Sequence, residues 1–179
     1  MTDPLTLLSP RNDAVFKMLL ARNRPLLIDL VNLVLVQYGY PHLTELFIDN
    51  AEVTAEQVGQ KFIALDIHAR DEAHHHYDIE MQVRSHAAYA ERALYYLSKL
   101  NAQQLLEGQR YAELRRVIGI HFLNFDLFPD DPQSRWAFEL RDRHRPEIRL
   151  TDQLALLIFE LQKQPLAEGS ALDQWVRFL

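Results

Sequence analysis

Two stretches near the middle of the chain, Phe62–His68 and Tyr77–Val83, alternate between apolar and polar residues. Alternation with a period of two is typical of strands that bury one face. The two strands are expected to pair antiparallel about the polar loop between them, and Asp66 then falls opposite Glu80. The shared polar face carries five side chains: Asp66, His68, Asp78, Glu80 and Gln82.

Other elements follow from apolar spacing and from the residues that begin and end helices. A first helix is predicted to begin at Asn12 or Asp13, either of which can cap it. Further helices are predicted over four ranges: 25–38, 86–108, 150–162 and 171–179. Further strands are predicted over three ranges: 46–48, 116–123 and 136–140.

Two of the predicted elements, the helix over 86–108 and the strand at 116–123, are expected to contribute to the core. The helix over 86–108 is the longest, and its apolar side is predicted to be buried. The residues on that side are Ala90, Leu94, Leu97, Leu100, Ala102 and Leu105. The apolar continuity of the strand at 116–123 favours a central place in the sheet. The order of elements predicts a mixed α/β layer arrangement rather than a regular βαβα repeat.

Length and composition limit the class of protein. The chain has 179 residues, which fits one domain with a substantial core. It has no cysteine, so a bound metal must be held by Asp, Glu, His or amide groups. The start of the chain lacks the pattern of a signal peptide, and no apolar stretch is long enough to cross a bilayer. We therefore expect a cytoplasmic protein without a membrane partner.

The charge distribution is compatible with a polyanionic substrate. The net charge of −6 argues against indiscriminate binding to nucleic acid. Most basic residues are nevertheless Arg, whose planar fork suits phosphate, and several gather at 110–116 and 141–149. An acidic site with Arg nearby would suit a metal-dependent enzyme. Solvated surface charge is an equally good interpretation of any single Arg.

The polar face of the predicted hairpin has the groups that phosphodiester cleavage needs. Magnesium held by two carboxylates, with positions left open for water, can neutralise charge on a phosphate and activate water. Asp66 and Glu80 can supply the oxygens, and Gln82 can orient the attacking water or touch the scissile phosphate. Manganese is expected to substitute for magnesium. Taken alone the pattern is weak, because a solvated sheet face can also carry alternating acids.

The chain resembles the PD-(D/E)XK nuclease superfamily, specifically its branch of recombination-promoting nucleases and transposases. The segments that carry the resemblance are 12–17, 65–66, 77–82, 91–100, 108–111 and 117–120. It implies a restriction-endonuclease-like core, in which a central mixed sheet flanked by helices holds metal on its strands. It also implies one nuclease-like domain over residues 1–179. Whether a C-terminal portion of a longer protein is missing stays open, because members of the branch are usually longer.

Carried over residue by residue, the resemblance implies roles for four positions. Asp66 and Glu80 would be the metal-binding acids. Gln82 stands where the superfamily more often has Lys, although Gln also occurs there within this branch. Asp13 lies at the position of the N-terminal helix where an acid can complete the metal site.

Several other polar residues admit two interpretations. Arg92 could contact phosphate near the metal or pair with an acid. Asp78 could be a third acid, but we expect a solvated position near the end of the strand. His68 could support the ligands or simply be exposed. The run His74–His76 is expected to form a surface loop with incidental affinity for nickel or zinc, since zinc sites favour spaced ligands.

The leading hypothesis is a magnesium-dependent DNA endonuclease that hydrolyses phosphodiester bonds in recombination or transposition. DNA would be its partner, and a homo-oligomer is left open. The alternative is a catalytically inactive nuclease fold that serves as a DNA-binding or assembly module, which Gln82 and the acidic net charge favour. A hydrolase for a small phosphate or sugar has little support, because the chain has no glycine-rich phosphate loop.

Overall fold

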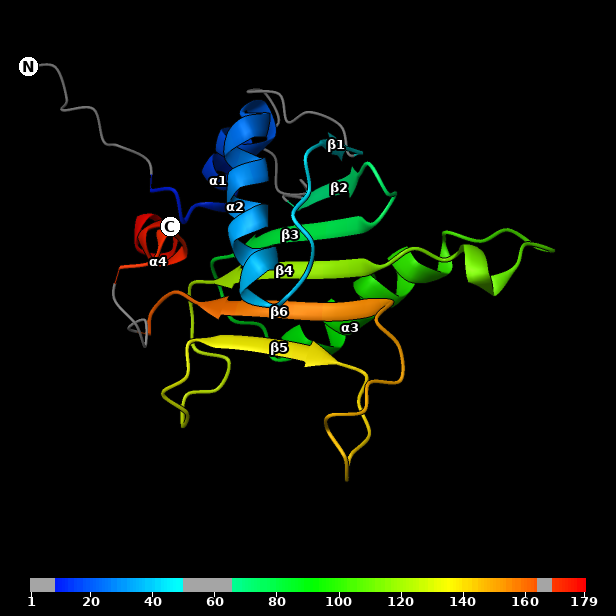
Figure 1. Cartoon of the computed structure of the whole chain (residues 1–179). Helices are drawn as coiled ribbons and strands as arrows, with labels where there is room; N and C mark the ends of the chain where they lie inside the picture. Colours follow the sequence, from blue (N-terminus) through cyan, green and yellow to red (C-terminus); the bar gives the residue numbers. More distant parts are fainter. Residues whose placement is uncertain (1–8, 50–65, 164–168) are drawn as a thin grey trace, which may run out of the picture.

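A mixed six-stranded sheet forms the centre of the protein. The computed structural model describes residues 9–49, 66–163 and 169–179. The strands are β1 (Leu46–Ile48), β2 (Ile67–Asp71), β3 (His76–Gln82), β4 (Val117–Leu123), β5 (Arg135–Glu139) and β6 (Leu154–Glu160). They lie side by side in the order β1-β2-β3-β4-β6-β5 (Figure 1). Strand β4 pairs parallel with β3 and β6, and the other neighbours pair antiparallel.

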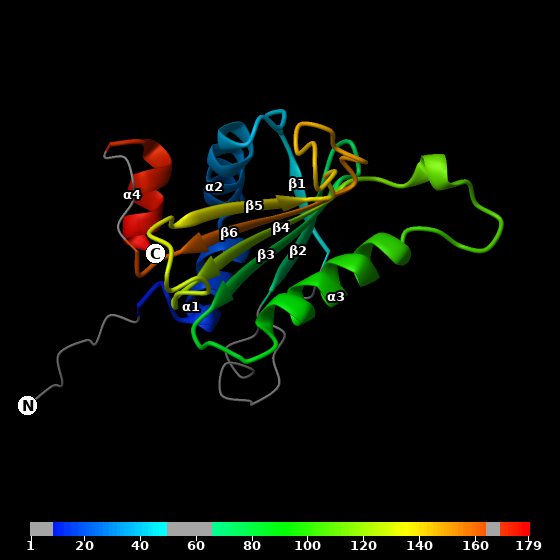
Figure 2. The ribbon, with the colours of Figure 1, turned by 90° about the horizontal axis from the view of Figure 1, so that it is seen from below.

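Helices cover both faces of this sheet. They are α1 (Asp13–Arg22), α2 (Arg24–Gln37), α3 (Tyr89–Ala102) and α4 (Ala171–Phe178), with a short 3-10 helix at Tyr111–Glu113. Figure 2 shows α1 and α2 on one side of the sheet and α3 on the other. This is the α/β architecture of a restriction-endonuclease-like core, as expected from the sequence. Among the described residues, no helix has the length and apolar character needed to span a membrane.

Local capping explains where the first helices begin. The side chain of Asn12 accepts hydrogen bonds from the backbone N–H groups of Ala14 and Val15, so Asn12 is the cap of α1. Asn23 caps α2, and Pro25 occupies its first turn, where a missing N–H costs nothing. Strand predictions at 46–48, 116–123 and 136–140 correspond to β1, β4 and β5 within a residue or two. The helix predicted over 171–179 is α4.

The hairpin of β2 and β3 has the predicted register. Ile67 pairs with Ile79, so Asp66, one residue earlier, is level with Glu80. The strand predicted at Phe62–His68 is confirmed only from Ile67 onward, because Phe62–Leu65 lies outside the described residues. Strand β2 continues to Asp71, which makes the loop shorter than predicted.

The buried side chain of Asp71 holds this shorter turn together. Its carboxylate accepts hydrogen bonds from the backbone N–H of Ala73 at 2.9 Å and of His75 at 2.8 Å. The hydroxyl of Tyr77 donates a third at 2.9 Å, and Nδ1 of His75 lies 2.8 Å from the same oxygen. Because these bonds fix the turn, they also fix which residues of β2 and β3 face each other.

Residues 150–162 were predicted as a helix, and this prediction is wrong. Leu154–Glu160 forms strand β6, between β4 and β5 in the sheet. A strand buried on both faces is apolar at successive positions, and a short run of this kind cannot be told from a buried helix by its period. The hydrogen-bonded pairing of this segment with β4 and β5 makes it a strand, and neither partner directly adjoins it in sequence.

The long helix is shorter than predicted, and of the predicted buried residues Leu97 is confirmed while the rest of the buried side differs. It ends at Ala102, and its buried residues are Tyr89, Ala93 and Leu97, at successive spacings of four. Leu94, which was predicted to be buried, is 58% exposed. Tyr89 and Ala93 pack with Leu123 and other residues in a small second core beneath the helix.

Most of the Arg residues in the two regions 110–116 and 141–149 have acidic partners. Arg141 and Arg149 both contact the carboxylate of Glu139. Arg116 pairs with Asp152, and Arg145 pairs with Glu147. These pairs favour the interpretation as surface charge over a phosphate-binding patch.

Glu160, at the end of β6, is a buried acid that organises the loop after β4. It is 1% exposed and lies 2.5 Å from Nζ of Lys163. It also accepts hydrogen bonds from Nε1 of Trp136 at 3.0 Å and from the backbone N–H groups of Leu127 and Phe128. Burial raises the pKa of Glu160, but Lys163 and these donors outweigh it, and the net pKa lies below the ordinary value of 4.5.

We expect Glu160→Ala to lower the free energy of unfolding by about 3 kcal/mol, because the variant removes the buried carboxylate that pairs with Lys163 and accepts from Nε1 of Trp136 and from the backbone N–H groups of Leu127 and Phe128. Since the folded pKa is depressed, this stabilisation is present above about pH 4.5 and is lost as the pH falls through the lower folded value. Urea unfolding between pH 3 and 7 measures it. The control is Glu147→Ala in an exposed ion pair, which should change little. Equal losses in both variants would contradict the prediction.

Candidate metal centre on the α3 face of the sheet

Alternation along β3 puts its polar side chains on the face that α3 covers. Tyr77, Ile79 and Met81 belong to the large core cluster on the side of α1 and α2. Asp78, Glu80 and Gln82 therefore point to the opposite face. On the neighbouring strands, His68 and His121 share that face, since His68 pairs with Asp78 and His121 pairs with Glu80.

Asp78 lies at the middle of this face. It was predicted to be solvated near the end of its strand, and this is wrong, because it is 1% exposed. Its two carboxylate oxygens face two imidazole rings: Nε2 of His68 lies 3.1 Å from Oδ1, and Nε2 of His121 lies 3.4 Å from Oδ2. Within the part of the chain that the structure describes, neither oxygen makes a hydrogen bond of acceptable geometry, and Nε2 of His121 makes none either. The centre of the face is therefore a buried charge near two ring nitrogens.

Among the described residues, two groups of possible metal ligands share Asp78. The first consists of Asp66, His68 and Asp78, and the second of Asp78, Glu80 and His121. Within each group the ligand atoms lie within 4.8 Å of one another. Asp66 and Glu80, the predicted pair of metal-binding acids, fall in different groups. The structure thus connects the two predicted acids through Asp78.

His121 and Tyr89 were not singled out from the sequence. His121 is 1% exposed, and its Nδ1 lies 2.6 Å from the hydroxyl of Tyr89 at the start of α3. This contact orients the ring so that its other nitrogen, Nε2, faces Asp78. A lone histidine in the otherwise apolar strand at 117–123 could have indicated a functional residue. That indication depends on the parallel pairing with β3, which places His121 beside Glu80 and which the sequence did not reveal.

Gly119 leaves the space that this arrangement needs. It pairs with Asp78 across β3 and β4. A Cβ atom at this position would lie 3.2 Å from Nε2 of His121, 3.1 Å from a methyl carbon of Leu97 and 2.8 Å from one of Leu156. The missing side chain therefore gives room both to the His121 ring and to the packing of α3 on β4.

The acids on this face have pKa values shifted in opposite directions. Burial raises the pKa of Asp66 and Asp78, but the neighbouring imidazoles outweigh burial, and the net pKa of each is lowered. The same contacts raise the pKa of His68 to about 10, so this ring is a cation at neutral pH. Glu80 differs, because burial and the charge of Asp78 raise its pKa. Closely placed acids with divergent pKa values are typical of functional sites.

Gln82 contacts the site through Glu80. Its Nε2 donates a hydrogen bond of 2.7 Å to Oε2 of Glu80. This bond fixes the carboxamide and leaves its oxygen as an acceptor. It also places the predicted pair Glu80 and Gln82 together at the end of β3.

Two further predicted residues lie on helices. Asp13 is the first residue of α1 and is half-buried, but among the described residues it is in neither group of possible metal ligands. Arg92 lies on α3, half-buried, and its charge acts on the pKa of Tyr89. Arg92 is thus close to the residue that orients His121.

Lys17 on α1 was also missed by the sequence reasoning. It is 3% exposed, burial lowers its pKa, and the charge of Asp66 acts in the opposite direction. A nearly buried lysine that interacts electrostatically with a predicted metal ligand is a candidate functional residue. It brings a positive charge to the site from a different element than β3.

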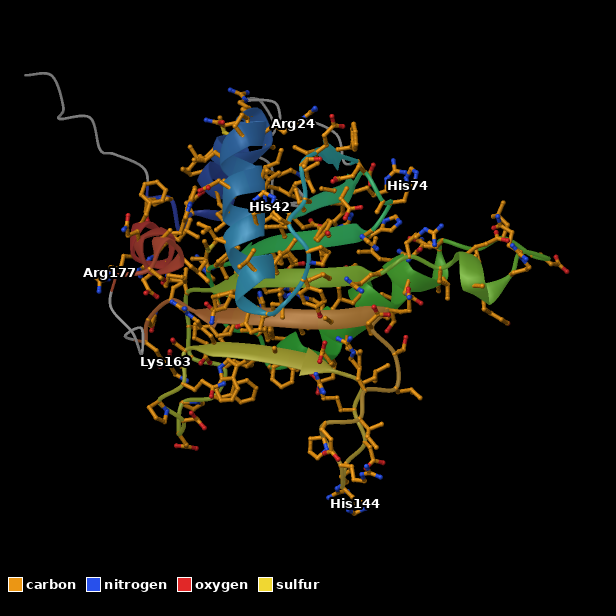
Figure 3. The ribbon with its side chains drawn as sticks, viewed as in Figure 1. Arg24, His42, His74, His144, Lys163 and Arg177 are labelled. Atoms are coloured by element: carbon orange, nitrogen blue, oxygen red, sulfur yellow. The ribbon has the colours of Figure 1, made fainter. Side chains whose placement is uncertain are left out.

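Only part of the histidine run lies away from this face: His74 and His75 precede β3, whereas His76 is its first residue and shares the face of Asp78 by alternation. His74 is in the turn between β2 and β3 and has a positive φ of 65° (Figure 3). His75 bonds to Asp71, and His76 is the first residue of β3. The described residues that group as possible metal ligands include none of the three. The expected surface loop agrees with His74, which is exposed in the turn, but not with His76, which is half-buried and belongs to β3.

The donor set fits a divalent cation. Three carboxylates and the imidazole nitrogens of His68 and His121 are ligands that divalent metals accept. The orphaned oxygens of Asp78 and Nε2 of His121 are buried polar atoms that a cation would satisfy. Gly119 contributes a space that any side chain would fill.

A mixed sheet with acidic residues on two adjacent strands defines the restriction-endonuclease-like class. The family model of PD-(D/E)XK nuclease family transposases matches residues 10–179, and the chain belongs to this family. Searches of curated proteins and of solved structures find no match. The resemblance noted in the sequence is therefore confirmed at the level of superfamily and transposase branch.

A cation bound at this centre should stabilise the fold, because it binds the folded chain only. At a Mn²⁺ concentration 100 times the dissociation constant we expect about 2.7 kcal/mol of stabilisation. Asp78→Asn should lose most of this effect, since Asp78 belongs to both ligand groups. Thermal unfolding with Mn²⁺ and with a chelator measures it. Glu107→Gln, which removes an exposed acid, is the control, and an equal shift in both variants would refute the assignment.

Proposed function

We propose that the protein is a divalent-metal-dependent DNA endonuclease that hydrolyses phosphodiester bonds in transposition or recombination. One observation carries the proposal: acids from two strands converge on a buried carboxylate, in a chain that belongs to a nuclease family. DNA is the proposed substrate because the family consists of transposase-type nucleases.

Asp66 and Glu80 are proposed as metal-binding acids on either side of Asp78. A divalent ion held there would neutralise charge on the scissile phosphate and acidify a water molecule. The ligand group of Asp66 and His68 is open to solvent, since the side chain of Asp66 is 21% exposed and that of His68 is 32% exposed. In the other group His121 is only 1% exposed. A polyanion would therefore approach from the β2 side. Asp13 is proposed to complete the site from α1.

Gln82 is proposed to position the attacking water. Its nitrogen donates to Glu80, so its oxygen can accept a hydrogen bond from water. A carboxamide cannot remove the proton, and Gln82 therefore orients the nucleophile without acting as a base. The positive charge that a lysine would bring at this position is supplied by other elements, and Lys17 near Asp66 and the cationic His68 are the candidates.

The alternative function is a DNA-binding or assembly module without catalysis. Gln82 in place of the more common lysine and the net charge of −6 favour it. The two functions differ in whether purified protein cleaves DNA.

Nicking of supercoiled plasmid separates these functions. We expect Asp66→Ala and Glu80→Ala to lower the cleavage rate by about 100-fold or more, because each removes a metal ligand. Glu107→Ala, which removes an exposed acid in a loop, should cleave like the parent. If the parent protein cleaves and both site variants cleave equally well, the assignment of these acids is wrong. If the parent does not cleave with any divalent metal, the inactive module is the better description.

Arg92 is proposed to contact a DNA phosphate beside the site. We expect Arg92→Ala to weaken DNA binding uniformly across sequences and to lower the slope of log K against log salt by about 1. Titrations by fluorescence anisotropy at several salt concentrations measure both quantities. Lys99→Ala removes an exposed cation further along α3 and is the matched control. A salt slope that Arg92→Ala leaves unchanged would exclude the phosphate contact.

A further inference from the structure

We propose that His121 is a metal ligand, and that it forms with Asp78 and Glu80 a site for transition-metal ions such as Mn²⁺ in preference to Mg²⁺. This assigns an ion class and a nitrogen ligand to the centre described above. It rests on the proposed function in that both place a divalent ion on this face of the sheet. Binding measured without DNA tests it independently of cleavage.

The parallel pairing of β3 and β4 builds the three-residue site. Glu80 and His121 are level across the two strands, and Asp78 lies two residues before Glu80 on the same face. One ligand atom from each residue lies within 4.8 Å of the others. Such spacing suits three atoms that surround one ion, and it comes from two rigid central strands rather than from a loop.

The orphaned atoms are the independent sign of a ligand. Asp78 and His121 are each 1% exposed, yet among the described residues both oxygens of Asp78 and Nε2 of His121 lack a hydrogen bond, and Oδ1 has only its ion-pair contact with His68 at 3.1 Å. Burying such groups without partners is costly, and native proteins rarely do so. The orphaned atoms of the two side chains also face each other, with Oδ2 and Nε2 3.4 Å apart. A cation between them would satisfy both.

Tyr89 prepares His121 for this role. The hydroxyl of Tyr89 lies 2.6 Å from Nδ1, which can donate its hydrogen to the hydroxyl oxygen. With Nδ1 held by Tyr89, Nε2 is the ring nitrogen that faces Asp78 and the one that would bind a metal ion. A metal-ligating histidine commonly has its second nitrogen held in this way, which fixes the tautomer and the orientation of the ring. Tyr89 is thus a positioning residue.

The nitrogen ligand decides the class of ion. Mg²⁺ prefers oxygen ligands in near-ideal octahedral geometry and keeps several waters. Imidazole suits later divalent metals, whose affinity for mixed nitrogen and oxygen sites rises along the first transition row. Mn²⁺ accepts both carboxylate and imidazole, so it fits two carboxylates and one imidazole better than Mg²⁺ does.

The competing interpretation is a site without nitrogen ligation, in which His121 is protonated and pairs with Asp78. Isothermal titration of the metal-free protein with Mn²⁺ and with Mg²⁺ separates the two. We expect Mn²⁺ to bind more than about tenfold more tightly than Mg²⁺. His121→Gln should weaken Mn²⁺ by about 10- to 100-fold and remove the preference, and Tyr89→Phe should weaken it by a smaller factor while keeping His121 as a ligand.

A spectroscopic measurement keeps the test valid even if a variant folds poorly. Electron spin echo of Mn²⁺ bound to the unmodified protein should show modulation from a coordinated imidazole nitrogen. The modulation should persist in His68→Gln, and also in His74→Asn and His144→Ala, which remove exposed rings in outlying loops (Figure 3). Absence of nitrogen modulation in the unmodified protein, or equal affinities for Mn²⁺ and Mg²⁺, would overturn the proposal. If Mn²⁺ binds through His121 but plasmid is not cleaved, the metal site stands and the proposed nuclease function fails.

Discussion

The face of the sheet beneath α3 depends on the burial of one carboxylate, that of Asp78. Removing an ionised carboxylate from water costs several kcal/mol unless opposite charges or ligands compensate it. Here His68 from β2 and His121 from β4 approach the two oxygens from either side. The cationic His68 offsets part of the charge, and on the other side Oδ2 lies 3.4 Å from Nε2 of His121 without a hydrogen bond among the described residues. The site is therefore a consequence of how three adjacent strands share one buried charge.

Fold and site use the same packing contacts. Tyr89 anchors the start of α3 in the small core under the helix and also bonds to His121. Gly119 admits both the His121 ring and the Leu97 side chain of α3. A change that moves α3 would thus move the imidazole as well. Precise placement of a ligand by packed helix and strand contacts is what a rigid metal centre requires.

Local patterns in the sequence were sufficient for the hairpin but not for its neighbours. Alternation at 66–68 and 77–82 gave the shared face and the register of β2 with β3, because both depend on residues close in sequence. The role of His121 depends on a parallel strand about 40 residues later, which local spacing does not reveal. The strand β6 was mistaken for a helix for the same reason, since only its two partners identify it. Asp78 was expected to be solvated because it was placed near the end of its strand; its burial depends on the pairing of β3 with β4 and on α3 above it, which local spacing does not reveal.

The substitution of glutamine for the usual lysine is easier to understand when the whole face is considered. A lysine at position 82 would bring its charge to Glu80 from the same strand. In this chain Gln82 donates to Glu80, and the candidates for positive charge come from β2 and α1 instead, as His68 and Lys17. His121 on β4 adds an imidazole, a side chain that commonly binds metals. The face therefore contains both the negative groups that attract a divalent ion and nitrogen groups able to bind it. A motif that departs from its family at one position is, in this geometry, compatible with a complete site assembled from several elements.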